Sequence, residues 1–164
     1  GYISAAQVQD LLFITDQFTE ALVNIEHPLA PDSQISVEIL RGQTSKKINM
    51  SGDEAKGIIV VSALARISET HETKHPLDPD IVKKIEDSVS KQIRKDLIKL
   101  IKLFQEDFSS DVFGFGELVY KNEYDFWKSV QDDWDTYFAQ MPIEILVDVK
   151  IKRAGLINKP SKAR

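Results

Sequence analysis

The chain has 164 residues, a formal net charge of -5 at pH 7 and no cysteine. A chain of this length can bury a sizeable core as one ordinary domain. Its composition, with 42% hydrophobic and 29% charged residues, is typical of a globular protein and excludes a disordered or fibrous one. The mild acidity argues against a nucleic-acid binder, which usually presents a strongly basic surface. Without cysteine, disulfides, thiolate metal sites and thiol nucleophiles are absent.

The chain starts with Gly1-Tyr2-Ile3 and has neither an initiating methionine nor the charged start and apolar core of a signal peptide. We therefore expect it to be a piece of a longer protein. The longest nearly uncharged apolar run, 57–65, is far shorter than the ~20 residues of a membrane-spanning helix. We expect residues 1–157 to form a single domain, soluble by itself, and residues 158–164 to form a flexible basic tail.

The start of the chain predicts a short helix followed by two strands. Ser4 is a suitable N-cap for this helix. The apolar side of the helix consists of Val8, Leu11 and Leu12. Alternation of apolar and polar residues predicts strands over 18–25 and 35–40, and the two prolines in 27–32 separate them.

The next segment predicts a hairpin and a central strand. A turn over 42–45 is expected to lead into a strand over 46–50, which ends at Ser51-Gly52-Asp53. Residues 58–67 are β-branched at their start and apolar at both odd and even positions. This pattern favours a strand in the middle of the sheet that is buried on both faces.

A long amphipathic helix is predicted to start after Asp78, with Pro79 at the first helical position, and to run to about Gln105. Its apolar stripe contains Ile81, Ile85, Val89, Ile93, Leu97 and Ile101. A helix of this length can lie across a whole sheet face.

The last elements are a further helix and a strand. Asn122 with Asp125 three residues later indicates a helix start, and Pro142 closes the helix. Its apolar residues are Trp127, Val130, Trp134, Phe138 and Met141. Apolar residues at 143, 145, 147, 149 and 151 alternate with polar residues at 144, 148, 150 and 152, and this pattern predicts a strand with one buried face.

These elements predict an α+β fold. We expect an antiparallel or mixed sheet of about four to five strands, with the long amphipathic helix packed on one face and shorter helices around it. The sequence leaves the order of the strands open.

His71-Glu72-Thr73-Lys74-His75 matches the zinc-hydrolase pattern H-E-x-x-H, in which two histidines on one helix face bind zinc and the glutamate activates water. Pro76 biases His75 toward an extended backbone, and no apolar helix stripe surrounds the motif. A solvated loop is the favoured interpretation, and a zinc metallopeptidase based on His71, Glu72 and His75 is the alternative.

Other candidate chemistry is sparse. The acidic residues 132, 133 and 135 lie between core positions of the predicted helix, where carboxylates usually keep a helix face in water. No serine lies in a G-x-S-x-G elbow beside a suitable histidine and acid. We therefore expect no catalysis and no catalytic, cofactor-binding or metal-ligating residue.

The most informative segment is Asp111-Val112-Phe113-Gly114-Phe115-Gly116, with Trp127 and Trp134 downstream. It lacks the third glycine of a dinucleotide turn and the Gly-Lys-Ser/Thr ending of a phosphate loop. Two glycines free to take positive φ let the backbone turn while Phe113 and Phe115 point into an apolar space, where the tryptophans can receive them. We favour a structural core over a ligand pocket near Trp127, Trp134 and Tyr137.

In this segment and the stretches around it, the sequence resembles the C subunits of spore germinant receptors, the Ger(x)C lipoproteins, in their C-terminal domain. The resemblance covers nearly the whole chain, but only 111–138 is specific. It is carried by Gln105, Asp111-Val112-Phe113-Gly114-Phe115-Gly116, Trp127-Lys128, Trp134, Phe138, Val147-Asp148-Val149-Lys150-Ile151 and Gly155, and upstream by the Gly-Tyr-Ile-Ser start and Ile67-Ser68-Glu69.

The resemblance implies a lipoprotein on the outer face of the spore inner membrane that acts with two integral membrane partners, the A and B subunits, to trigger germination by nutrients. It implies no catalysis and no cofactor. The lipid-anchored cysteine would lie outside this chain. The expected role is protein–protein interaction, with direct binding of a nutrient as an alternative, and the partner surface is expected to lie away from 111–116.

Overall fold

The computed structural model describes residues 2–18, 20–68 and 78–152. In chain order the elements are α1 (Ala5–Ile14), β1 (Ala21–His27), β2 (Ala30–Ser51), β3 (Glu54–Ile67), α2 (Pro79–Leu103), a π-helical turn (Phe104–Phe108), α3 (Phe115–Asn122), α4 (Tyr124–Val130), a 3-10 turn (Gln131–Asp133), α5 (Trp134–Gln140) and β4 (Ile143–Ile151). The expected basic tail, 158–164, lies outside the described residues.

The four strands form one mixed sheet in the order β1-β2-β3-β4. β1, β2 and β3 pair antiparallel, whereas β4 runs parallel to β3. This arrangement, with the long helix on one face, confirms the predicted α+β class.

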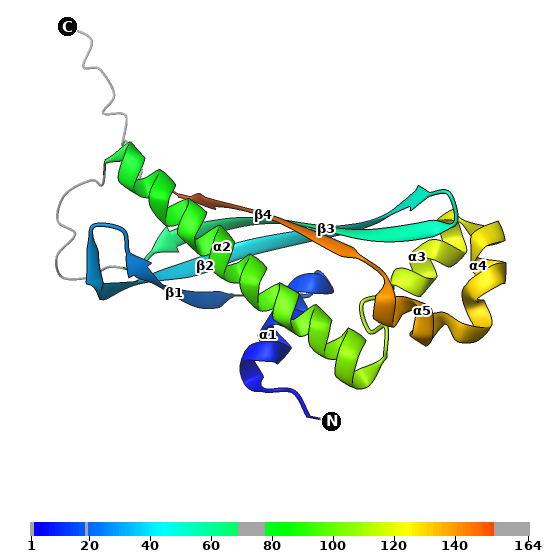
Figure 1. The fold of residues 1–164 in the computed structure, drawn as a ribbon. Helices are drawn as coiled ribbons and strands as arrows, with labels where there is room; N and C mark the ends of the chain where they lie inside the picture. The colour runs from blue at the N-terminus through cyan, green and yellow to red at the C-terminus, as the bar shows by residue number, and fades with distance from the viewer. Residues whose placement is uncertain (1, 19, 69–77, 153–164) are drawn as a thin grey trace, which may run out of the picture.

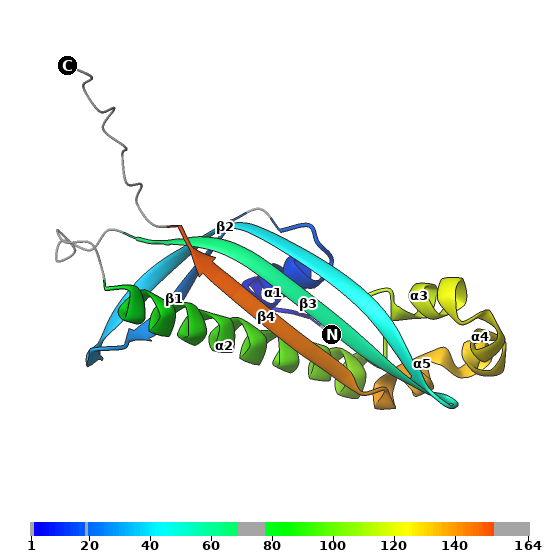
Figure 2. The same cartoon turned by 90° about the horizontal axis from the view of Figure 1, so that it is seen from above.

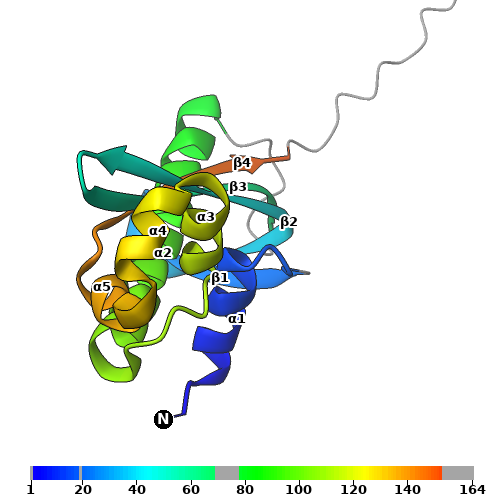
Figure 3. The ribbon, with the colours of Figure 1, turned by 90° about the vertical axis from the view of Figure 1, so that its right-hand side faces the viewer.

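The helices lie on one side of the sheet (Figure 1). α2 contacts both edge strands, β1 and β4, so the curved sheet wraps partly around it. α1 lies on the same side, and α3, α4 and α5 form a lobe beside the far end of the β2–β3 hairpin, seen end-on in Figure 3. No helix of the described part covers the opposite, convex face (Figure 2).

The helix starts predicted at Ser4 and at Asp78 are confirmed. Ser4 and Gln7 form a capping box at the start of α1. The side chain of Asp78 accepts a hydrogen bond from the backbone of Asp80, and Pro79 is the first residue of α2. The apolar stripe of α2 is buried against the sheet, which is the main source of stability for such a helix.

The predicted turn over 42–45 is wrong, because β2 is one continuous strand of 22 residues. The register of β2 against β3 shifts between Ile39 and Arg41, and this bulge moves the buried side from odd to even positions. In the sequence, this change of parity looks like the end of one strand and the start of another. Gly42 does not form a turn. It lets two aromatic rings lie close to the strand, since an added Cβ would lie 3.1 Å from the rings of Phe13 and Phe18.

β3 occupies the middle of the sheet as predicted, between β2 and β4. The expectation that both its faces are buried is wrong. Ile59, Val61 and Ala65 are buried on the helix side, whereas Leu64 on the other side is 37% exposed. β3 therefore has apolar residues on both faces, but one face is buried under the helices and the other belongs to the partly exposed convex face of the sheet.

The single helix predicted from 122 to 141 is also wrong. Glu123 has φ -133° and ψ 55°, which ends α3, and a 3-10 turn over Gln131–Asp133 separates α4 from α5. Spacings of three and four between aromatic residues are compatible with several short helices as well as with one long helix.

Candidate functional site

Asp111 is the centre of the turn that starts the lobe. Its Oδ1 accepts hydrogen bonds from the backbone N–H groups of Phe113 (3.2 Å) and Gly114 (3.0 Å). Its Oδ2 accepts from the backbone of Gly116 (2.6 Å) and from the indole Nε1 of Trp134 (3.1 Å). One carboxylate thus satisfies backbone donors at the N-terminus of α3 and fixes an indole ring from α5.

The two glycines of this turn have different roles. Gly114 precedes α3 with φ 80° and ψ 26°, a left-handed conformation that glycine adopts without strain. Gly116 is not at positive φ, which corrects the expectation for this residue. A Cβ on Gly116 would lie 2.8 Å from Nε1 of Trp134, so glycine is needed there for the indole to lie against α3.

Phe113 and Phe115 are buried, at 1% and 0% exposure. Their rings pair with other phenylalanines: Phe113 with Phe104 at 5.3 Å, and both with Phe138 at 6.1 and 6.4 Å. The tryptophans do not receive these rings, contrary to expectation. Gly57 of β3 leaves the space for Phe115, since a Cβ there would lie 2.8 Å from that ring.

Polar contacts attach the lobe to the sheet. The ammonium group of Lys46 on β2 donates to the carbonyl oxygen of Phe113. The hydroxyl oxygen of Tyr137 accepts from the backbone N–H of Ala55 at 2.8 Å. Sequence reasoning named Tyr137 only for a possible ligand pocket and did not name Lys46, and it missed both contacts because neither has a local sequence signal.

Gln105, in the turn after α2, holds the end of α5. Its Nε2 donates to the carbonyl oxygens of Phe138 and Met141, each at 2.8 Å. These bonds satisfy acceptors that a helix C-terminus leaves without intrahelical partners.

The aromatic residues form a chain from the lobe's core to its surface. Trp134 lies 5.4 Å from Trp127, measured between ring centroids, and Trp127 lies 6.2 Å from Tyr120. Tyr120 in turn lies 5.7 Å from Tyr124. Exposure rises along this chain, from 9% for Trp134 to 52% and 55% for the two tyrosines.

A cavity of about 470 Å³ lies between the hairpin tip and helices α4 and α5. Its lining includes Tyr137, Met141 and the acidic residues Glu54 and Asp133. The ligand pocket considered from the sequence was placed near Trp127, Trp134 and Tyr137, but only the tyrosine lines this cavity.

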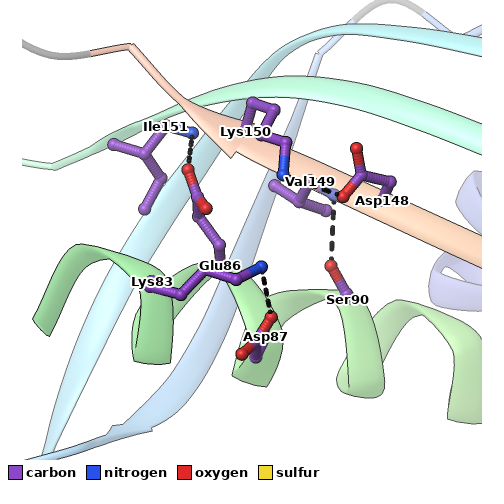
Figure 4. Close-up of polar contacts among 8 residues, drawn as sticks. All are labelled: Lys83, Glu86, Asp87, Ser90, Asp148, Val149, Lys150 and Ile151. Carbon is purple, nitrogen blue, oxygen red and sulfur yellow. Dashed lines mark hydrogen bonds and ion pairs between the residues drawn. The ribbon is translucent and has the colours of Figure 1, made fainter. Parts of the chain in front are cut away.

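A second polar cluster connects α2 to the free edge of β4 (Figure 4). Oε1 of Glu86 accepts from the backbone N–H of Ile151 at 2.9 Å, and Oγ of Ser90 accepts from Val149 at 3.1 Å. Arg94, four residues further along α2, donates to the carbonyl oxygen of Ile145 in β4. These side chains occupy backbone groups that an edge strand would otherwise present to another chain.

The convex face of the sheet carries an apolar band between ion pairs. Leu64 and Leu146 are 37% and 49% exposed. The ion pair between Lys56 and Glu144 lies at one end of the band. At the other end, Arg66 of β3 forms an ion pair with Glu38 of β2 at 2.7 Å.

The described part of the chain shows no group of three or more His, Asp or Glu side chains placed to hold a metal ion. His71, Glu72 and His75 lie outside the described residues. None of the described helices is both long and apolar enough to cross a membrane.

The comparison with known families concerns the whole domain. The family model described as spore germination B3/GerAC like, C-terminal, matches residues 1–155. The chain belongs to this family. The resemblance to germinant receptor C subunits, which Asp111 to Gly116 and the tryptophans carry in the sequence, is thereby confirmed.

Similar proteins include other germination proteins. The GerAC-like domain is 30% identical to spore germination protein KC of Bacillus subtilis over 52% of this chain and 21% of that protein. It is 23% identical to spore germination protein GerQC of Bacillus cereus over 87% of this chain and 39% of that protein. This chain therefore spans less than half the length of these relatives.

The fold of the GerAC-like domain is also found in a solved structure. The crystal structure of the GerBC protein matches with a TM-score of 0.81 and 17% identity, over 92% of this chain and 46% of that chain. At this identity the likeness establishes the fold.

Proposed function

We propose that this GerAC-like domain is a non-catalytic part of a nutrient germinant receptor subunit and acts through protein–protein contacts with integral membrane subunits of the receptor. The match of residues 1–155 to the GerAC-like family carries the proposal. In this proposal the subunit is a lipoprotein on the outer face of the spore inner membrane, and the lipid anchor lies outside this chain.

The arrangement of the lobe supports a structural role for the turn at Asp111. All four hydrogen bonds of its carboxylate go to groups of the lobe itself. Exposed aromatic and apolar side chains on the lobe and on the convex face provide surfaces of the kind that protein partners use.

Co-purification tests this function directly. The full-length subunit that contains this domain would be tagged in spores, the membranes extracted with detergent, and the bound proteins identified by mass spectrometry. We expect the two integral membrane subunits to be recovered with the tagged protein and not with an unrelated tagged spore membrane protein. Recovery of the subunit without either of them would contradict the proposal.

Binding of a nutrient is the second candidate, because the cavity beside Tyr137 is large enough for a small molecule. Tryptophan emission of the purified chain would be followed during titration with amino acids and sugars. A saturable change that Tyr137→Ala abolishes would favour this candidate. Stoichiometric zinc that His71→Ala removes would instead favour the metallopeptidase alternative.

A further inference from the structure

Helix α4 has an unusual position for a helix rich in large side chains. None of its seven residues is fully buried, although it carries Phe126, Trp127 and Val130. Tyr124 on α4 and Tyr120 on α3 are 55% and 52% exposed. We call Tyr120, Tyr124 and Trp127 the aromatic face. Exposed tyrosine and tryptophan side chains are enriched at sites where proteins bind partners.

The aromatic face is held rigidly from below. Trp127 packs at 5.4 Å from Trp134, whose indole N–H is bound by Asp111. Gly116 leaves the space in which that indole lies. The turn of 111–116 therefore supports a neighbouring surface, and a preorganised surface loses less entropy when it binds.

Charge indicates what kind of partner fits this face. Residues 104–141 contain nine acidic and two basic residues, a net charge of -7, whereas the rest of the chain has seventeen acidic and nineteen basic residues, a net charge of +2. Both lysines of the segment already form ion pairs, with Glu117 and Asp125. Asp111 is bound by the donors of its own turn, and the other carboxylates without an ion pair to a described residue are Glu106, Asp107, Glu123, Asp132, Asp133 and Asp135.

The lobe itself shows how the aromatic face can bind a cation. The ammonium group of Lys128 lies 5.2 Å from the ring centroid of Tyr124, within the range of a cation–π interaction. The neighbouring cavity has Glu54 and Asp133 in its lining, and no lysine or arginine. Aromatic rings on a lobe with an excess of carboxylates attract lysine and arginine side chains and repel an anionic membrane surface.

We infer that the aromatic face and the adjoining cavity form a docking surface for a Lys/Arg-rich segment of a partner protein. The inference rests on the proposed function, since it names the surface and the type of segment through which the domain would bind its partner. The convex face, by contrast, has an ion pair at each end of its apolar band.

Binding of model peptides to the chain tests the chemistry. The probes are short peptides of alternating Lys and Ser or Arg and Ser, with a Glu and Ser peptide as control, and the readout is tryptophan emission at low and high salt. We expect salt-sensitive binding of both cationic peptides and none of the acidic peptide. We expect Tyr120→Ser with Tyr124→Ser, and separately Asp132→Lys with Asp133→Lys, to weaken binding about tenfold, or about 1.4 kcal/mol.

The matched control is Leu22→Ser with Glu26→Lys, which changes one exposed apolar and one acidic residue on β1, away from the lobe. Circular dichroism and melting curves verify that each variant is folded. Equal binding by the lobe variants and this control would overturn the inference. So would binding to phosphatidylcholine vesicles or self-association through the aromatic face in place of peptide binding.

The same variants in the tagged full-length subunit separate this inference from the proposed function. Loss of the membrane subunits from the lobe variants but not from the β1 control supports the docking surface. If all variants retain them, the docking surface is wrong while the proposed function stands. If the unmodified subunit retains none, the proposed function fails, whatever the peptides show.

Discussion

At the scale of single residues, the carboxylate of Asp111 and the two glycines after it determine how the lobe begins. The carboxylate needs donors on both of its oxygens, and it obtains them from three backbone groups and one indole. Gly114 supplies the left-handed backbone, and Gly116 supplies the space for Trp134. These requirements differ, so the two glycines respond differently to substitution.

Replacement of Gly114 tests the backbone requirement. Gly114→Ala should destabilise the chain by about 1 kcal/mol and Gly114→Val by more, because side chains with a Cβ resist positive φ. No atom lies within 4 Å of an added Cβ, so the effect is one of conformation alone. Gly114→Asn should cost less, since asparagine tolerates this region. Urea unfolding measures the three values, and equal stability of all three would contradict the prediction.

Replacement of Gly116 tests the space requirement. Gly116→Ala and Gly116→Val should destabilise by about 2 kcal/mol or more, because the indole of Trp134 must move and loses its bond to Asp111. Tryptophan emission should shift in these variants and stay unchanged in Gly114→Asn. An unchanged spectrum together with an unchanged melting temperature would show that the indole does not depend on this glycine.

Asp10 on α1 gives the molecule a pH dependence. Burial, and secondarily the charge of Asp96 on α2, raises the pKa of Asp10 from 3.8 to about 6, against an opposing effect of Lys99. A carboxyl with a raised folded-state pKa stabilises the fold below pH 3.8 and loses that contribution as the pH rises through about 6.

Asp10→Asn should therefore stabilise the chain at neutral pH, by on the order of 1 kcal/mol after solvent screening is allowed for. At mildly acidic pH, below the folded-state pKa, the gain should shrink. Melting temperatures of both proteins across this range measure the difference. A gain that is the same at every pH would mean that the charge of Asp10 is not its cause.

At the scale of elements, α2 both covers the sheet and closes one of its edges. Glu86 is 9% exposed, and its carboxylate accepts from the backbone of Ile151, while Ser90 accepts from Val149 (Figure 4). The apolar stripe of α2 predicts which face is buried, but this polar row beside it is what positions β4 against the helix.

Glu86→Leu should lower the free energy of unfolding by about 1–3 kcal/mol, because the N–H of Ile151 loses its acceptor. Glu86→Gln should cost less, since the amide oxygen can still accept. Amide hydrogen exchange at Ile151 should accelerate in the leucine variant. The control is Lys83→Ala with Asp87→Ala, which removes an exposed ion pair on the same helix and should leave exchange at Ile151 unchanged.

At the scale of the whole molecule, the lobe and the sheet are joined at the tip of the long β2–β3 hairpin. Phe115 enters the space above Gly57, and Tyr137 binds the backbone of Ala55. The hairpin tip and the lobe therefore cover each other, and we expect them to unfold in one transition.

Tyr137→Phe should destabilise the chain by about 1–2 kcal/mol, since it removes the acceptor of a buried N–H group at Ala55. Tryptophan emission reports on the lobe, and far-ultraviolet circular dichroism reports on the sheet and helices together. Their unfolding transitions should coincide in the wild type and shift together in the variant. A shift of the emission transition alone would show that the lobe unfolds independently.

Local patterns in the sequence determine much of the fold. Ser4, Asp78 with Pro79, and the apolar stripe of α2 predict both main helices because capping and helical periodicity depend only on near neighbours. The alternation of 143–151, which Leu146 interrupts, predicts β4 for the same reason. The resemblance to the family, specific over 111–138, is evident from the sequence alone, and the family match over residues 1–155 confirms it.

Only the tertiary structure decides the rest, because it depends on contacts between distant parts of the chain. The bulge after Ile39, the parallel pairing of β4 and the exposed convex face follow from register and packing, which alternation does not encode. The separate roles of Gly114 and Gly116 likewise depend on where Trp134 lies. The sequence shows that these glycines matter, and the packing of the lobe shows that one shapes the backbone and the other makes space for an indole.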